Sequence, residues 1–133
     1  MRSVKWIKTL VALGAFSASA FAANALETKK YDDAAFKAAQ AAGAEIVVHV
    51  TAPWCPTCKA QHQALGEIGK NGDYAKVAVF DVDFDTQTDA LKAFKANSQS
   101  TLIAFKGATE TGRLVGATKA EQIETLVKST MKK

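Results

Sequence analysis

The sequence has few cysteines, prolines and histidines, with two of each among its 133 residues. Cys55 and Cys58 are close neighbours, and a disulfide that closes so short a loop removes little entropy from the unfolded chain, so a purely structural role is a poor explanation. A zinc site built on these thiols needs about two more ligands, and only His49 and His62 remain. Covalent haem attachment needs a histidine directly after the second cysteine, where the chain has Lys59. The sequence therefore favours neither a metal site nor a haem.

Long apolar runs are also absent, and the excess of positive charge is confined to the N-terminus. Three of the 17 basic residues lie within residues 1–8, and no acidic residue precedes Glu27. The net charge of +4 therefore gives little reason to expect nucleic-acid binding. An apolar stretch from Thr9 to Phe21 follows, and its length of about 13 residues is short of the roughly 20 that cross a membrane. Ala20 and Ala22 then place small residues where a signal peptidase reads.

This three-part leader predicts a secretory signal peptide over residues 1–22 and a mature domain over residues 23–133. No cysteine lies near the cleavage region, so a lipid-modified N-terminus is not expected. The leader is of bacterial type, which predicts a periplasmic protein in an oxidising compartment. A leader that is retained as an N-terminal anchor is the alternative.

The mature chain alternates between strand and helix patterns. The β-branched run 46–51 predicts a central strand buried on both faces, and Pro53 ends it. A helix over residues 55–68 follows, with Pro56 in its first turn, where the missing N–H costs nothing. Similar patterns predict a short first strand near 26–29, helices from 32 to 43 and from 86 to 96, and strands at 77–82, 101–105 and 113–115.

The order of these elements predicts one α/β domain. Strands that alternate with helices favour a sheet with parallel pairs and helices on both faces, and a hairpin connection over residues 107–112 adds an antiparallel edge. Thr118, with Glu121 three residues later, predicts a capping box at the start of a last helix.

The segment Trp54-Cys55-Pro56-Thr57-Cys58-Lys59 is the one that indicates chemistry. Cys55 at a helix N-terminus meets unpaired backbone N–H groups and the positive end of the helix dipole, which favour the nucleophilic thiolate. Cys58 lies within one helical turn, so its sulfur can reach that of Cys55. One exposed attacking thiol and one shielded resolving thiol are what disulfide exchange through a mixed disulfide requires.

This segment, placed after a hydrophobic strand, resembles the active site of thioredoxins and their periplasmic relatives. The element order over residues 26–133 is also similar, which implies a thioredoxin fold with a mixed sheet. The resemblance implies that Cys55 attacks protein disulfides, that Cys58 resolves the mixed disulfide and that no bound cofactor is needed. It also implies a substrate groove formed by Trp54, Ser100, Thr101 and the glycine turn at Gly116.

Three positions depart from the family pattern. Ser100 stands where the family has a cis-proline, which leaves the geometry of the Gln99–Ser100 peptide open and brings a hydroxyl near the sulfurs. His49 replaces a buried aspartate, and Asp81 replaces the lysine that often accompanies it. His49 is therefore predicted to accept the proton of Cys58, with a hydrogen-bonded core histidine as the alternative. His62 and the acids of the strand end near Asp81 are expected to be solvated.

The direction of electron flow stays open. The Pro56-Thr57 pair predicts an intermediate redox potential and slightly favours a reductant or the partner of an isomerase. The expected partners are protein thiols and disulfides and a membrane thiol–disulfide electron donor or acceptor, and a monomer is expected. Two other functions remain possible for the sequence. One is a periplasmic protein that handles a soft metal such as Cu(I) through Cys55, Cys58 and His49, and the other is a binding module with an inert disulfide.

Overall fold

Strands and helices alternate along residues 26–133, the part of the chain that the computed structural model describes. The predicted signal peptide, residues 1–22, lies outside these residues. No helix within residues 26–133 is long and apolar enough to cross a membrane. In chain order the elements are β1 (Glu27–Lys30), α1 (Asp33–Ala41), β2 (Glu45–Thr51), α2 (Pro56–Ile68), a 3₁₀ turn (Gly72–Tyr74), β3 (Ala78–Asp83), α3 (Thr88–Phe94), β4 (Thr101–Lys106), β5 (Thr109–Val115) and α4 (Ala120–Ser129).

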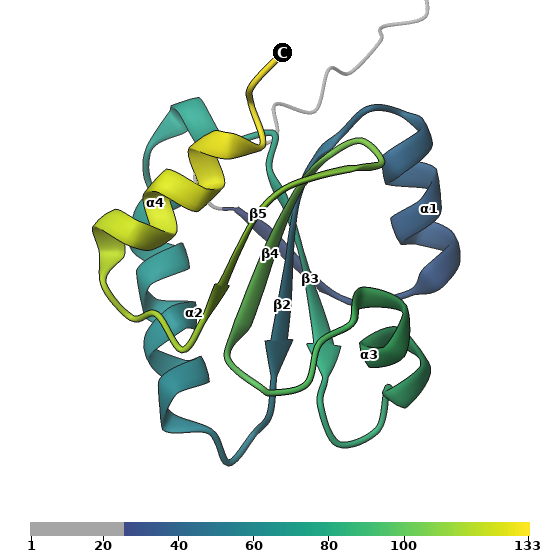
Figure 1. The fold of residues 1–133 in the computed structure, drawn as a ribbon. Coiled ribbons are helices and arrows are strands. Elements are labelled where there is room, and N and C mark those ends of the chain that lie inside the picture. The colour runs from purple at the N-terminus through teal and green to yellow at the C-terminus, as the bar shows by residue number, and fades with distance from the viewer. Residues whose placement is uncertain (1–25) are drawn as a thin grey trace, which may run out of the picture.

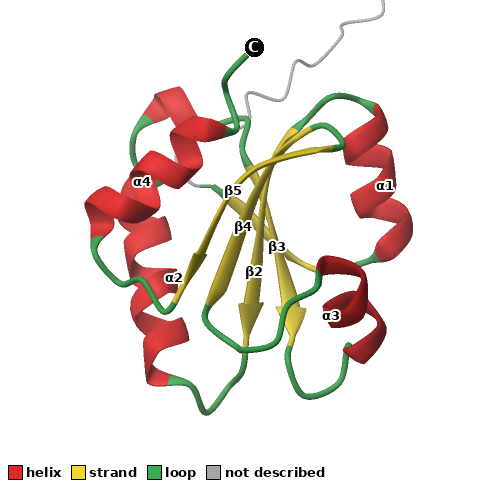
Figure 2. Cartoon of the chain, in the orientation of Figure 1, coloured by secondary structure: helices red, strands yellow, loops and turns green. Residues whose placement is uncertain are grey.

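The five strands form one sheet in the order β1-β3-β2-β4-β5. β3 pairs in parallel with β1 and β2, whereas β4 pairs antiparallel with β2 and β5. The parallel strands β2 and β3 are joined through α2, because parallel neighbours need a crossover connection. Helices α1 and α3 cover one face of the sheet, and α2 and α4 cover the other (Figure 1; Figure 2). The predicted α/β fold, with helices on both faces, is confirmed.

The middle strand β2 is buried on both sides, as its β-branched composition predicts. Successive side chains of a strand point to opposite faces. Val48 packs in the cluster that contains Phe36 of α1, and Val47 packs in the cluster that contains Leu65 of α2. His49 lies two residues after Val47 and therefore points towards α2, where the sequence offers it polar partners.

Local chemistry explains where two of the helices begin. The Asp32 side chain accepts a hydrogen bond of 2.8 Å from the Ala35 N–H and caps α1. Pro56 occupies the first turn of α2, directly after Cys55, whose backbone is extended and whose sulfur accepts the Cys58 N–H. The helix that carries the cysteines therefore starts where the sequence predicts it.

Two local predictions are wrong. The capping box of Thr118 and Glu121 does not form, because α4 begins later, at Ala120 after Lys119, without a side-chain cap. The segment before α4 is held instead by a hydrogen bond from the Gln61 side chain to the Ala117 carbonyl. The hairpin connection is also shorter than residues 107–112: the positive φ of Gly107 (57°) allows a tight turn, so β5 starts at Thr109.

The two edge strands of the sheet differ in length and regularity. β1 has four residues, all exposed, with the sequence Glu-Thr-Lys-Lys. β5 is longer and pairs with β4 through a register shift between Ala104 and Phe105. Glycine occupies position 112 of β5, where a Cβ atom would lie 2.8 Å from the Leu126 side chain of α4. The absence of a side chain there lets α4 pack closely on this edge.

Candidate active site

The two cysteines lie where β2 ends and α2 begins. Cys55 is the N-cap residue of α2 and Cys58 lies in the first turn, with 5.3 Å between their Cα atoms and the sulfurs joined as a disulfide. The Cys58 backbone N–H donates a hydrogen bond of 3.1 Å to Cys55 Sγ. An N–H group that helical geometry would leave unpaired is thus directed at the Cys55 sulfur.

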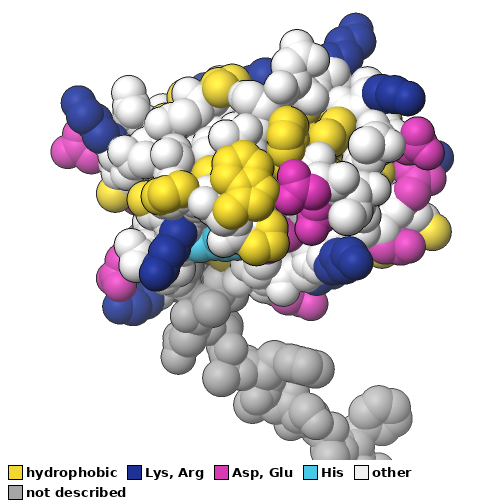
Figure 3. Space-filling model, turned by 90° about the horizontal axis from the view of Figure 1, so that it is seen from below, with side chains coloured by type: hydrophobic (Ala, Val, Ile, Leu, Met, Phe, Trp, Pro, Cys, Tyr) yellow, Lys and Arg dark blue, Asp and Glu magenta, His cyan; other side chains and the backbone are white. Residues whose placement is uncertain are grey.

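The surroundings of the two sulfurs are unequal. Cys55 is 5% exposed and Cys58 is 1% exposed. A depression of about 340 Å³ is lined by Cys55 but not by Cys58, and Lys59 and His62 also line it. Figure 3 looks onto this end of the molecule, where hydrophobic side chains gather beside acidic ones; the exposed histidine is His62, because His49 is fully buried. A substrate reaching this end meets the Cys55 side of the disulfide first.

Trp54 is the most prominent apolar side chain beside the cysteines. It is 58% exposed, and its indole N–H donates a hydrogen bond of 2.9 Å to Asp85 Oδ2. Asp83 in turn accepts the backbone N–H groups of Asp85 and Thr86 at 2.8 and 3.0 Å. Asp83 organises the loop after β3 and Asp85 orients the indole, so these side chains are not simply solvated at the end of a strand.

Ser100 lies against both sulfurs, as the sequence predicts. Its hydroxyl is 3.2 Å from Cys55 Sγ and 3.2 Å from Cys58 Sγ. There is no cis peptide bond in residues 26–133, so the Gln99–Ser100 bond is trans, and Ser100 instead has a left-handed backbone with φ of 61°. The Ser100 N–H donates a hydrogen bond of 2.8 Å to the Val50 carbonyl. A proline at this position would lose that bond and could not adopt the positive φ.

The predicted groove residues Gly116 and Thr101 have different environments. Gly116 is exposed, has a φ of 70° and donates its N–H to the Ser100 carbonyl at 2.8 Å. Thr101 is 1% exposed, and its hydroxyl donates to the Ser98 carbonyl. The structure therefore places Ser100 and Gly116 together beside the cysteines and turns the Thr101 side chain inward. Their role in binding substrate remains a prediction.

Gln61 is not among the predicted site residues, yet it connects the segments around the disulfide. Its side chain is fully buried and donates to the Ser100 carbonyl at 3.0 Å and to the Ala117 carbonyl at 2.9 Å. Its Oε1 lies 2.9 Å from His49 Nε2. One signal was present: Gln61 lies three residues after Cys58 on the buried face of α2, a polar residue at an apolar position.

The bonds of Gln61 determine which nitrogen of His49 carries a proton. Two carbonyl oxygens face the Gln61 amide group, so that group must be the NH₂ end, and Oε1 must accept. His49 Nε2 therefore donates to Gln61. In the neutral imidazole the other nitrogen, Nδ1, then carries a lone pair, and this atom lies 3.4 Å from Asp81 Oδ1.

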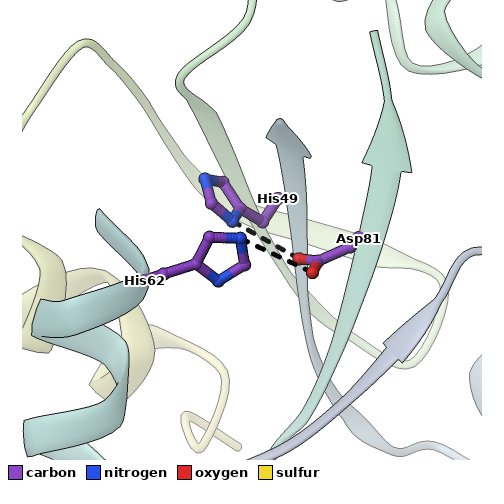
Figure 4. Close-up of side chains that lie close together, drawn as sticks. All are labelled: His49, His62 and Asp81. Carbon is purple, nitrogen blue, oxygen red and sulfur yellow. Dashed lines mark ion pairs between the residues drawn. The ribbon is translucent and has the colours of Figure 1, made fainter. Parts of the chain in front are cut away.

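His62 completes this group of polar side chains (Figure 4). Its Nε2 lies 3.6 Å from Asp81 Oδ2, and its ring meets the His49 ring edge to face at 4.4 Å between centroids. Burial and the neighbouring His49 lower the pKa of His62, while Asp81 partly opposes the change. The His62 side chain is 38% exposed, so the prediction of a solvated residue holds only in part.

Comparison with known proteins agrees with this geometry. The sequence model of the thioredoxin family matches residues 27–129. The chain belongs to the thioredoxin family. An H-type thioredoxin of Fagopyrum esculentum is 33% identical over 86 residues, which are 65% of this chain and 72% of that protein. The crystal structure of Trxlp from Edwardsiella tarda has a TM-score of 0.73 and 39% identity, over 76% of this chain and 98% of that one.

Thioredoxin O2 of Arabidopsis thaliana in its oxidized state superimposes with a TM-score of 0.66 at 22% identity, over 82% of this chain and 96% of that one. This likeness shows the shared fold. Family membership together with the Cys55–Cys58 disulfide makes this member of the thioredoxin family a thiol–disulfide oxidoreductase.

The thioredoxin fold brings His49 near the cysteines without joining it to them. Neither ring nitrogen of His49 is hydrogen-bonded to Cys58 Sγ. The connection runs from His49 through Gln61 to the Ser100 carbonyl, and the Ser100 hydroxyl contacts Cys58. The predicted role of His49 as a proton acceptor remains a prediction, and Gln61 is the residue through which it would have to act.

Proposed function

We propose that this oxidoreductase exchanges disulfides with protein substrates, with Cys55 as the attacking thiol and Cys58 as the resolving thiol. The observation that carries the proposal is the asymmetry of the site, in which Cys55 lines the surface depression and Cys58 lies beneath it. The exposed Trp54 next to Cys55 offers an apolar surface on which an extended protein segment can rest.

In the reducing direction the Cys55 thiolate attacks one sulfur of a substrate disulfide. That substrate bond breaks, a mixed disulfide forms, and the first substrate thiolate leaves. The Cys58 thiol then gives up its proton and attacks Cys55, which releases the second substrate thiolate and closes the Cys55–Cys58 disulfide. Two electrons pass to the substrate, and the proton of Cys58 is transferred to the second substrate thiolate as it leaves.

The chain supplies three features that stabilise the attacking thiolate. Cys55 lies at the positive end of the α2 dipole, it accepts the Cys58 N–H, and the Ser100 hydroxyl lies at hydrogen-bond distance. These features favour the reduced state more than the disulfide, since a disulfide sulfur is uncharged. We propose a potential between those of strong reductants and strong oxidants, because stabilising the thiolate raises the potential above that of a strong reductant. On the Pro56-Thr57 pair we also propose a role as a reductant or as the partner of an isomerase. A membrane thiol–disulfide protein would supply or accept the electrons, and the protein would act as a monomer.

Trapping of intermediates tests the assignment of the two cysteines. We expect Cys58→Ser to accumulate mixed disulfides with substrate proteins, because Cys55 can still attack while nothing resolves the product. Cys55→Ser should accumulate none, since the remaining thiol is buried. Non-reducing electrophoresis of each variant after acid quenching measures both. The reverse pattern would exchange the two roles, and a wild-type disulfide that does not exchange with glutathione would indicate a binding module instead.

Export is proposed on the sequence of the leader alone. We expect protein from the periplasmic fraction to begin at or near Ala23, because residues 1–22 have the three parts of a signal peptide. Intact-mass measurement of the purified protein checks the cleavage position. Protein that keeps Met1 and stays with the membrane fraction would show that the leader is an anchor.

A further inference from the structure

Three metal-ligand side chains converge beside the disulfide without involving either cysteine. His49 comes from β2, His62 from α2 and Asp81 from β3, and one ligand atom from each lies within 4.8 Å of the others (Figure 4). Figure 4 shows both rings turned towards the Asp81 carboxylate. Three separate elements of the fold therefore aim their polar ends at one point.

Two atoms at this point are buried and have no hydrogen-bond partner within residues 26–133. These atoms are His49 Nδ1 and Asp81 Oδ1. His49 is fully buried, and its Nε2 proton is already donated to Gln61, so the neutral ring presents a lone pair to a carboxylate oxygen. Two acceptors facing each other in a buried site are unfavourable unless a positively charged species lies between them.

The distances between the histidine nitrogens and the Asp81 oxygens help to distinguish a bound metal ion from a shared proton. A charge-assisted hydrogen bond between nitrogen and oxygen is about 2.7–2.9 Å long. Here His49 Nδ1 lies 3.4 Å from Asp81 Oδ1, and His62 Nε2 lies 3.6 Å from Asp81 Oδ2. Tetrahedral zinc with bonds of about 2.0–2.1 Å to nitrogen and oxygen keeps its ligand atoms about 3.4 Å apart. Both contacts with Asp81 are longer than such a hydrogen bond and close to the separation of two zinc ligands, and the ligand atoms of all three residues lie within 4.8 Å of one another.

We propose that His49 Nδ1, His62 Nε2 and the Asp81 carboxylate bind a Zn²⁺ ion. The fourth position faces the solvent side, where the His62 side chain is 38% exposed and the Asp81 side chain is 24% exposed. His62 also lines the depression that contains Cys55, which gives the ion a route in from the surface. Two imidazoles and one carboxylate with an open fourth position form a donor set that zinc commonly takes.

The surroundings of the three ligands support this assignment. A histidine that binds a metal usually donates its other ring N–H to a fixed acceptor, which holds the ring in place, and Gln61 Oε1 fills this role for His49. Lys59, which lines the same depression, carries a charge that opposes a cation.

Cobalt titration of the oxidised protein tests the site, because the disulfide removes both thiols as ligands. The protein must carry no histidine tag. We expect one equivalent of Co²⁺ to give visible ligand-field bands with the intensity of a four-coordinate ion, and Zn²⁺ to abolish them. His49 and His62 are the two histidines of the chain, so their ring signals in NMR spectra should both shift with one equivalent of Zn²⁺.

Variants decide whether the ion binds at these residues. His62→Ala and Asp81→Asn should each weaken Zn²⁺ binding at least tenfold in calorimetric titration, whereas Asp83→Asn, a nearby carboxylate outside the cluster, should leave it unchanged. His62→Ala changes a half-exposed side chain, so it keeps the test valid if Asp81→Asn does not fold, as judged by circular dichroism. If the wild type does not bind Zn²⁺, the proposal is overturned, and a proton shared between His49 and Asp81 would explain the geometry. Equal Zn²⁺ binding by His62→Ala and Asp83→Asn would also overturn it. Since the oxidised protein is used, neither result depends on the exchange activity.

Discussion

Replacing Gln61 by leucine should lower the free energy of unfolding by about 3 kcal/mol, because leucine keeps the volume and removes three hydrogen bonds at once. The largest part of the loss comes from His49, whose buried Nε2–H has no other partner in the part of the chain that the structure describes. The Ala117 carbonyl also loses its donor, whereas the Ser100 carbonyl still accepts the Gly116 N–H. This loss in the free energy of unfolding is several times the loss that an ordinary substitution of a surface residue causes.

Urea unfolding of the oxidised protein, followed by circular dichroism, measures this loss. Gln63→Leu is the matched control, because Gln63 is an exposed glutamine on the same helix and its replacement should change stability by no more than about 0.5 kcal/mol. Similar midpoints for the two variants would contradict the connecting role of Gln61. The same samples can be assayed for insulin reduction, which should slow in Gln61→Leu, since the loops that carry Ser100 and Ala117 lose their common anchor.

Replacing Ser100 by alanine should make the protein a stronger reductant. The hydroxyl stands 3.2 Å from each sulfur and can donate to a Cys55 thiolate, whereas it gains little from the uncharged disulfide. A hydrogen bond to a charged group contributes about 1.5–3 kcal/mol. Losing it should lower the reduction potential by about 30 mV or more, which is at least a tenfold change in the equilibrium with glutathione.

Equilibration of wild type and Ser100→Ala with glutathione buffers, followed by thiol alkylation, measures this shift. Alanine keeps the Cβ atom, so the strain of the positive φ at position 100 is the same in both proteins. Ser98→Ala lies in the same loop, where the Ser98 side chain has no hydrogen bond among the described residues, and should keep the wild-type potential. A potential that is unchanged, or raised, in Ser100→Ala would show that the hydroxyl does not stabilise the thiolate.

Much of the fold was predictable because strong local signals agree with tertiary burial. The β-branched run of β2 and Pro56 after Cys55 each admit essentially one local structure, and both are found where the sequence predicts them. The start of α4 was not predictable from local signals. Thr118 and Glu121 form a good capping pattern, but the preceding Ala117 is fixed by Gln61, a residue distant in sequence, and the helix begins only at Ala120.

The cysteines and Ser100 were predictable in position, but the backbone of Ser100 was not. The residue type serine does not indicate a left-handed backbone. This conformation depends on hydrogen bonds with Val50 and Gly116, which are distant in the sequence. The contacts of His62 with His49 and Asp81 were not predictable for a related reason. Helical spacing places His62 one turn after Cys58, but only the pairing of β2 with β3, which sets His49 beside Asp81, shows which groups its ring meets.

The two edge strands of the sheet affect whether copies of this protein associate with one another at high concentration. A free strand edge is a template on which another chain can add, and such association leads to aggregates. β1 offers a very short template, so a second copy would gain few bonds, and it carries Lys29 and Lys30, charged side chains of the kind that discourage pairing at a sheet edge. β5 offers a longer edge, but the bulge in its pairing with β4 distorts it, and Arg113 lies on it. The sheet that holds the cysteines in place is thus built to resist being extended.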